Sequence, residues 1–373
     1  MSEYQWYEFV AVDRPLSEKE QTALRGISTQ AEISATRFWN EYQWGDLKAD
    51  PAKLLAKYFD LHLYFANWGT HRLMLRVPKD RVDLASLKPY FAGAPRELTV
   101  HGEHLVIDLR SENDGGDDGE EPPSLATLAP VRALLLQGDL RPAYLAWLCG
   151  LQEGEREDDA PEPPVPAGLG KLDGPLEALA DFLRIDVDLL AAAAEASPEF
   201  DDDEAGLVPW VKALPEAERL RWLLRAAKHP ELALGAELRA AYRQTRAPVR
   251  SASLRTAAEL WKRAEQLRSK REAREAAAQT RSEAAAERRR QKRLEALAER
   301  GAEAWAELAQ KVDEREYEKA VALASDLHAL AERDGKLEAF DARFAQLKKR
   351  LARRKGFFDR FKRAMRPSVA EYF

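Results

Sequence analysis

The first 110 residues carry apolar positions at strand spacing, broken by short helical patterns. The run "YQWYEFVAVD" (residues 4–13) is aromatic and β-branched on both faces, which predicts a central strand. "AEISATRFWNEY" (residues 31–42) predicts a second strand. Ser17 with Glu20 is a capping box that predicts a helix start, and Asp50 followed by Pro51 predicts another.

Two hairpins follow from the same alternation. In "LHLYFANWGTHRLMLRVP" (residues 61–78) the leucines at odd positions predict a core-facing side, with a turn near Gly69. In "ELTVHGEHLVIDLR" (residues 97–110) Gly102 at the first turn position predicts a type II′ hairpin. That turn would pair Val100 with Leu105 and Leu98 with Ile107.

Beyond residue 111 the apolar spacing becomes helical. The predicted fold class is an α+β N-terminal domain (residues 1–111) followed by mostly α-helical domains with a long helix. Composition and periodicity divide the rest of the chain as follows: an acidic linker (112–124), a helical segment (125–151), an acidic Pro-rich linker (152–172), a helical domain (173–250), a long basic, alanine-rich helix (251–301), a helical hairpin (302–355) and a basic aromatic tail (356–373).

Composition limits the classes of protein to which this chain can belong. There is no run of eighteen apolar residues, and the N-terminus lacks the basic and apolar regions of a signal peptide, so we expect a cytoplasmic, bacterial-type protein. Cys149 is the single cysteine, which excludes an intrachain disulfide and a cysteine-based zinc site. The net charge of −6 divides into +10 for residues 250–373 and −16 for residues 1–249. The basic half is therefore the expected partner-facing end.

The long helix has no obvious packing face. Between Leu267 and Leu294 its only apolar residues are alanines, and residues 270–293 hold nine basic and four acidic residues. None of those four glutamates has a basic residue four positions later, so the cations are not neutralised locally. We predict an anion- or nucleic-acid-binding stripe from residues at and near heptad spacing: Arg274, Arg281, Arg288, Arg289, Arg290, Lys292 and Arg293. The alternative is a weak coiled coil with an alanine seam at Ala273, Ala277 and Ala284.

The C-terminal end is the second basic element. From Lys348 to Arg366 it holds ten basic residues against one acid, interleaved with phenylalanines. This mixture suits anionic lipid, nucleic acid or the chain's own acidic half. The predicted anion-binding residues here are Lys348, Lys349, Arg350, Arg353, Arg354 and Lys355.

The N-terminal domain offers two weaker sites. Tyr64, Arg72 and Arg76 share one face of the first hairpin, where basic and aromatic side chains could stack bases. The simpler expectation is that a helix covers this face. His101 and His104 face each other across the second hairpin and could share a metal ion, although a polar pair at an exposed hairpin tip is the commoner arrangement.

Two stretches carry a resemblance. "EYQWYEFVAVDRPLSEKE" with "WNEYQWGDLKADPAKLLAKYFDLHLYFANWGTHRLMLR" resembles the opening of a bacterial protein family that has no established activity. "YEKAVALASDLHALAERDGKLEAFDARFAQLKKR" is similar to the helical C-terminal segment of some SWIM-type zinc-finger proteins. The Cys and His zinc ligands of that class are absent, so the resemblance implies a helical docking element alone.

The sequence thus predicts a non-enzymatic adaptor or scaffold that binds a protein partner through its helical C-terminal half, in a nucleic-acid-associated complex. The alternatives are an enzyme with its active site in the aromatic N-terminal domain and a direct nucleic-acid-binding protein. No nucleophile-elbow or His-Glu-x-x-His motif is present, and no cofactor is expected. An anionic membrane surface and a second copy of the chain, paired through residues 254–300, are the remaining candidate partners.

Overall fold

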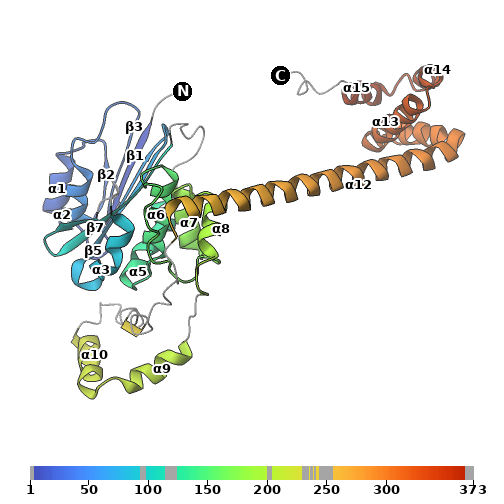
Figure 1. Ribbon diagram of the computed structural model, residues 1–373. Coiled ribbons are helices and arrows are strands. Elements are labelled where there is room, and N and C mark those ends of the chain that lie inside the picture. Colours follow the sequence, from blue (N-terminus) through green and yellow to red (C-terminus); the bar gives the residue numbers. More distant parts are fainter. Residues whose placement is uncertain are drawn as a thin grey trace. The chain divides into compact units, whose positions relative to one another are not determined.

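A computed structural model (Figure 1) describes residues 4–92, 98–113, 124–199, 204–228 and 255–365, with four further positions between 235 and 242. The chain divides into two compact units, an N-terminal unit (Met1–Lys270) and a C-terminal unit (Arg271–Phe373). The predicted fold class is confirmed, because an antiparallel sheet is followed by a mostly helical chain with one long helix. The predicted acidic linker at 112–124 lies almost entirely outside the described residues.

The centre of the N-terminal unit is a seven-stranded antiparallel sheet in the order β2-β3-β1-β4-β5-β7-β6. Its strands are β1 (Gln5–Val10), β2 (Glu32–Ile33), β3 (Arg37–Tyr42), β4 (Leu61–Ala66), β5 (Thr70–Pro78), β6 (Leu98–His101) and β7 (His104–Glu112). Both predicted hairpins form, and the register Val100–Leu105 and Leu98–Ile107 is confirmed. Gly102 has φ 59°, as a first turn position of this hairpin type requires.

One face of the sheet is covered by α1 (Glu18–Arg25) and α2 (Pro51–Tyr58) (Figure 1). Both predicted helix starts are confirmed. The Ser17 hydroxyl accepts from the amide of Glu20, whose carboxylate accepts from the amide of Ser17, and the Asp50 carboxylate accepts from the first free amides of α2. The core beneath these helices includes Phe9, Phe38 and other aromatic side chains.

The opposite face packs against a larger helical layer. The described part of the N-terminal unit also contains η1 (Lys79–Arg81), α3 (Leu84–Phe91), α4 (Leu125–Leu128), α5 (Pro130–Leu136), α6 (Arg141–Gln152), α7 (Gly174–Phe182), α8 (Val187–Ala194), α9 (Glu204–Ala213) and α10 (Glu216–Lys228). Helices α3 to α8 share one core with Leu63, Leu73 and Ile107 of the sheet. The helical segment predicted at 125–151 and the first part of the helical domain predicted at 173–250, as far as α8, therefore belong to the same unit as the sheet.

Residues 152–172 differ from the linker predicted for them. Their acidic, Pro-rich composition indicated a linker, but the segment packs against the helical layer, and Leu169 and Glu162 are 3% exposed. Glu162 accepts hydrogen bonds from the Tyr144 hydroxyl and from both the Nε and Nη2 atoms of Arg255, the latter two at 2.8 Å. The linker prediction is wrong here because a half-buried arginine, distant in sequence, supplies the partner that composition cannot reveal.

The long helix α12 (Ala257–Asp313) begins inside the core of the N-terminal unit, with Ala257, Leu260 and Ala264 buried. Ion pairs join the first turns of α12 to the two caps of α8: Arg263 pairs with Glu195 at the C-cap, and Arg268 pairs with Asp186 at the N-cap. The predicted interruption at Gly301 is confirmed: this residue is non-helical, with φ 43°, and the kink there divides α12 into two helical stretches.

The core of the C-terminal unit is built from residues 297–312 of α12 and three further helices. These are α13 (Tyr317–Arg333), α14 (Leu337–Arg350) and α15 (Lys355–Ala364). The basic aromatic tail predicted at 356–373 is instead a helix as far as Ala364, because Phe357 and Phe361, four positions apart, are buried against α13 and α14. Within the described residues, no helix is both long and apolar enough to cross a membrane.

Candidate functional site

The sheet face with Tyr64, Arg72 and Arg76 does not present free cations. Arg76 is 7% exposed and donates to Asp60 at 2.7 Å, beneath α2. Arg72 pairs with Asp108 at 2.6 Å, and the Tyr64 hydroxyl donates to Gln5. Desolvation raises the pKa of Tyr64 to about 12, so it stays a neutral hydrogen-bonding group. The expectation that a helix covers this face is therefore met at the end of the face that carries Arg76, which lies beneath α2.

Asp60 is the centre of a buried ionic cluster. Its carboxylate accepts from the amides of Val12 and Asp13 and from Arg76, and Arg132 lies 3.6 Å away while it pairs with Asp13. Burial opposes ionisation of Asp60, but the amide of Asp13, the guanidinium of Arg76 and the amide of Val12 together lower its pKa. Each of these contacts ties strands to helices, so the cluster has a structural role.

His101 and His104 are cross-strand partners at the hairpin tip, as predicted. His101 is exposed and His104 is half-buried, and burial followed by the charge of Arg76 lowers the pKa of His104. A metal site needs further ligands. Within the described part of the chain, no group of three or more His, Cys, Asp or Glu side chains lies close enough together to hold a metal ion.

His62 is one of the fully buried ionisable groups of this unit. It is fully buried, stacks on Phe9 at 3.9 Å between ring centroids, and its Nδ1 lies 3.0 Å from the carbonyl oxygen of Glu8. Desolvation lowers its pKa to about 3, so the ring is neutral at physiological pH. An uncharged ring held inside an aromatic core packs well but is not accessible to a substrate.

The exposed middle of α12 carries the predicted arginine stripe. Every residue from 272 to 290 is exposed, which agrees with the absence of an apolar face in this stretch. Arg290 lies 4.0 Å from Glu287, and Arg293 pairs with Asp326 of α13 at 3.1 Å. Within the described residues, the side chains of Arg274, Arg281, Arg288, Arg289 and Lys292 have no ion pair.

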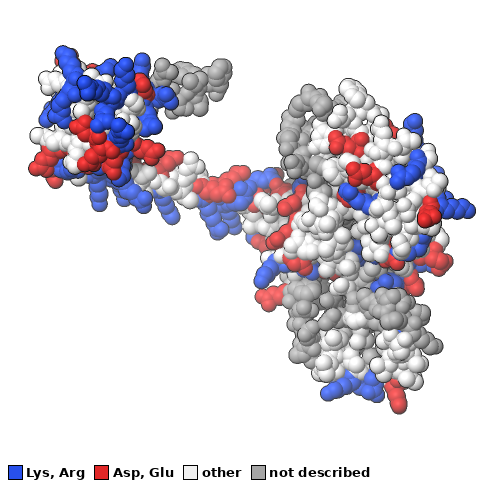
Figure 2. All heavy atoms as spheres, turned by 180° about the vertical axis from the view of Figure 1, so that it is seen from behind, with Lys and Arg blue, Asp and Glu red and all other residues white. Residues whose placement is uncertain are grey.

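Helices α14 and α15 carry the densest positive charge. Figure 2 shows Lys and Arg side chains gathered over this part of the C-terminal unit. We define the α14–α15 basic surface by its exposed cations: Lys348, Lys349, Arg350, Arg353, Lys355, Arg360, Lys362 and Arg363. Arg360 lies over the Tyr317 ring, and Asp359 is the single acidic residue between positions 348 and 365. The remaining cations of this surface make no ion pair within the part of the chain that the structure describes.

Arg354 differs from its neighbours. It is half-buried and donates to the carbonyl oxygen of Asp313, at the end of α12, at 3.0 Å. Its contact holds the α14–α15 turn against α12, so it shapes the surface and is not a free anion ligand.

Arg360, Lys362 and Arg363 were not among the predicted binding residues. The signal that could have identified them is the spacing of Phe357 and Phe361, which places both rings on one side of a helix and the basic residues on the other.

Comparisons with known proteins add no assignment: no family model, no curated protein and no solved structure matches the chain.

Proposed function

We propose that this protein is a non-enzymatic adaptor whose C-terminal unit binds the phosphate backbone of a nucleic acid through the α14–α15 basic surface. The observation that carries the proposal is a dense group of exposed lysines and arginines that make no ion pair with any described residue. Phosphate contacts need mobile, solvated cations of this kind and require no sequence readout. The arginine stripe of α12 would add further phosphate contacts, and the proposal keeps the expected cytoplasmic location.

The composition of this surface favours phosphate over a protein interface. Protein interfaces are enriched in exposed aromatic anchors and depleted in lysine. Here the rings of Phe357 and Phe361 are buried, while Lys348, Lys349 and Lys362 are exposed. A protein partner would therefore find mostly charge on this surface, with half-buried Phe358 and exposed Met365 as the apolar side chains of α15 and its cap.

The same burial argues against insertion into a membrane. An amphipathic helix binds a bilayer by placing its apolar side among the acyl chains. In α15 that side is Phe357, which is fully buried, and Phe361, which is 8% exposed within the unit's own core. A lipid surface could attract the cations but could not bury these two rings.

The enzyme alternative has less support. The close pairs of ionisable residues in the N-terminal unit, such as Asp60 with Arg76 and Glu162 with Arg255, connect elements of the fold to one another. Residues used in this way satisfy each other's charge and leave no nucleophile activated by a base.

The test measures binding of the full chain to fluorescent duplex and single-stranded nucleic acid across a salt series. We compare it with the triple variant Lys349→Glu, Lys355→Glu, Lys362→Glu. If the three lysines contact phosphates, the slope of log affinity against log salt should fall by about 2–3, since each contact to duplex DNA contributes about 0.9. The matched control reverses three exposed lysines of the N-terminal unit, Lys19, Lys48 and Lys88, and should leave the slope unchanged.

Two results would contradict the proposal. One is equal nucleic-acid affinity of the triple variant and the matched control at every salt concentration. The other is binding to phosphatidylserine vesicles without measurable binding to either form of nucleic acid, which would assign the surface to anionic lipid instead.

A further inference from the structure

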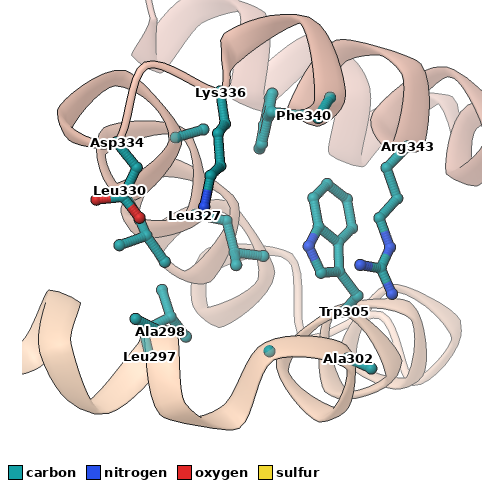
Figure 3. A pocket seen from close by; sticks show the side chains of 13 residues that line it. Leu297, Ala298, Ala302, Trp305, Leu327, Leu330, Asp334, Lys336, Phe340 and Arg343 are labelled. Carbon is teal, nitrogen blue, oxygen red and sulfur yellow. The ribbon is translucent and has the colours of Figure 1, made fainter.

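The C-terminal unit also contains a pocket of about 440 Å³ between α12, α13 and α14, within the usual range for a ligand site (Figure 3). Its floor is apolar and buried, formed by Leu297, Leu327 and Phe340. The half-buried indole of Trp305 lies against Phe340, with 5.4 Å between ring centroids. An apolar side chain entering here would meet leucine and aromatic surface on several sides.

The mouth of the pocket is positively charged. The Arg343 guanidinium lies 5.2 Å from the centroid of the Trp305 ring, and Figure 3 shows the side chain of Lys336 extending toward the pocket from the start of α14. Asp334, the one acidic lining residue, is already hydrogen-bonded to Arg333 at 2.9 Å. Lys336 has no ion pair within the described residues, so the mouth has an excess of positive charge.

One wall of the pocket is made of small, exposed residues of α12: Ala298, Gly301 and Ala302. A methyl group added at Gly301 would meet no atom within 4 Å, so the space in front of the helix break is open. Small wall residues allow the backbone of another chain to approach closely. The solvent-exposed rim suits a segment that extends beyond the pocket better than a molecule enclosed by it.

We infer that this pocket, which we call the kink pocket, binds an acidic peptide segment of a partner protein. A bulky apolar side chain of that segment would contact Trp305 and Phe340, and a neighbouring carboxylate would pair with Lys336 and Arg343. Charge complementarity selects the acidic partner, and the apolar anchor supplies the affinity that charge alone lacks. The inference goes beyond the proposed nucleic-acid contact, because it uses different residues and supplies the second partner that an adaptor requires.

The test selects peptides from a random twelve-residue display library against the full chain and, in parallel, against Ala302→Trp. Position 302 is exposed and helical, so the indole should fill the pocket without disturbing the core. We expect the wild-type chain to enrich peptides with a bulky apolar residue within about four positions of Asp or Glu, one helical turn. Ala302→Trp should bind those peptides at least about tenfold more weakly.

A charge-reversed variant, Lys336→Glu with Arg343→Glu, gives a second readout that does not depend on Ala302→Trp folding normally. It should lose the acidic peptides and enrich basic ones. Lys349→Glu, on the α14–α15 basic surface, is the matched control and should keep the acidic peptides. Nucleic-acid affinity of Ala302→Trp should equal that of the wild type, so failure of either proposal can be recognised separately.

Three outcomes would overturn the inference. The first is enrichment of the same peptides by the wild type and by both pocket variants. The second is enrichment of peptides without acidic residues. The third is that indole-3-acetate, tested by calorimetry, binds the wild type and not Ala302→Trp while no peptide is enriched, which would make the pocket a small-carboxylate site.

Discussion

Glu162 connects the segment 152–172 to the start of α12, and its removal should loosen that connection. The carboxylate is 3% exposed and accepts hydrogen bonds from Tyr144 and from two nitrogens of Arg255. The same two residues are also joined by a backbone hydrogen bond, in which the amide of Glu162 donates to the carbonyl oxygen of Arg255 at 2.8 Å. Two residues later, the amide of Ala257 donates to Ala160. The perturbation is Glu162→Gln, which keeps the shape and removes the charge.

The expected cost follows from the burial of the two partners. Removing one member of a buried ion pair costs about 3–5 kcal/mol, because the other charge is left without a partner. The side chain of Arg255 is 21% exposed, so water compensates part of its charge. We therefore expect Glu162→Gln to reduce the free energy of unfolding of the N-terminal unit by about 2–4 kcal/mol.

The assay is denaturant unfolding of the full chain, combined with hydrogen exchange of the amides in the first turns of α12. The matched control is Glu195→Gln, which removes the partner of Arg263 on the same helix. Glu195 is 43% exposed, so its loss should cost less than about 1 kcal/mol. Equal costs for the two variants, or unchanged exchange at residues 257–264 in Glu162→Gln, would refute the reasoning.

Three further changes test the two cores. Asp60→Asn should lower the free energy of unfolding by about 3–5 kcal/mol, because it leaves Arg76 without its carboxylate. The folded-state pKa of Asp60 is lowered, so its contribution to stability is present above about pH 4 and is lost as the pH falls further. The variant should lack that acid dependence when melting is measured as a function of pH. Gly69→Ala should destabilise the β4–β5 hairpin by about 2–4 kcal/mol, measured by thermal melting, because φ is 111° and the new methyl would lie 1.8 Å from the carbonyl oxygen of Asn113. Phe357→Ala should lower the stability of the C-terminal unit by about 3–5 kcal/mol, measured by circular dichroism, because the Phe357 ring is fully buried. Phe358 is half-buried, so Phe358→Ala should cost clearly less stability, and equal losses would contradict the placement of α15.

The sequence by itself determined the local elements. Strand alternation and a glycine at the turn set the register of the 98–112 hairpin, because a shift by one residue would expose its whole apolar set. The Ser17–Glu20 box and the Asp50–Pro51 pair determined two helix starts through contacts within four residues. The lack of apolar residues larger than alanine between 268 and 293 likewise predicted a helix without a packing face, and this stretch is exposed on every side from 272 to 290.

Only the tertiary structure decided which charged and aromatic residues are available to a partner. The sequence offered Arg76 as a basic residue on an open sheet face, but Asp60 holds it; likewise, the carboxylate that holds Arg255 comes from 93 positions away. In the sequence, the phenylalanines of the last helix suggested binding to lipid or nucleic acid. In the structure, Phe357 and Phe361 are buried against α13 and α14, and the lysines of α15 stay exposed. The kink pocket likewise depends on three helices meeting around Gly301. Local patterns determine how a segment folds, whereas burial depends on contacts between segments that are distant in the chain.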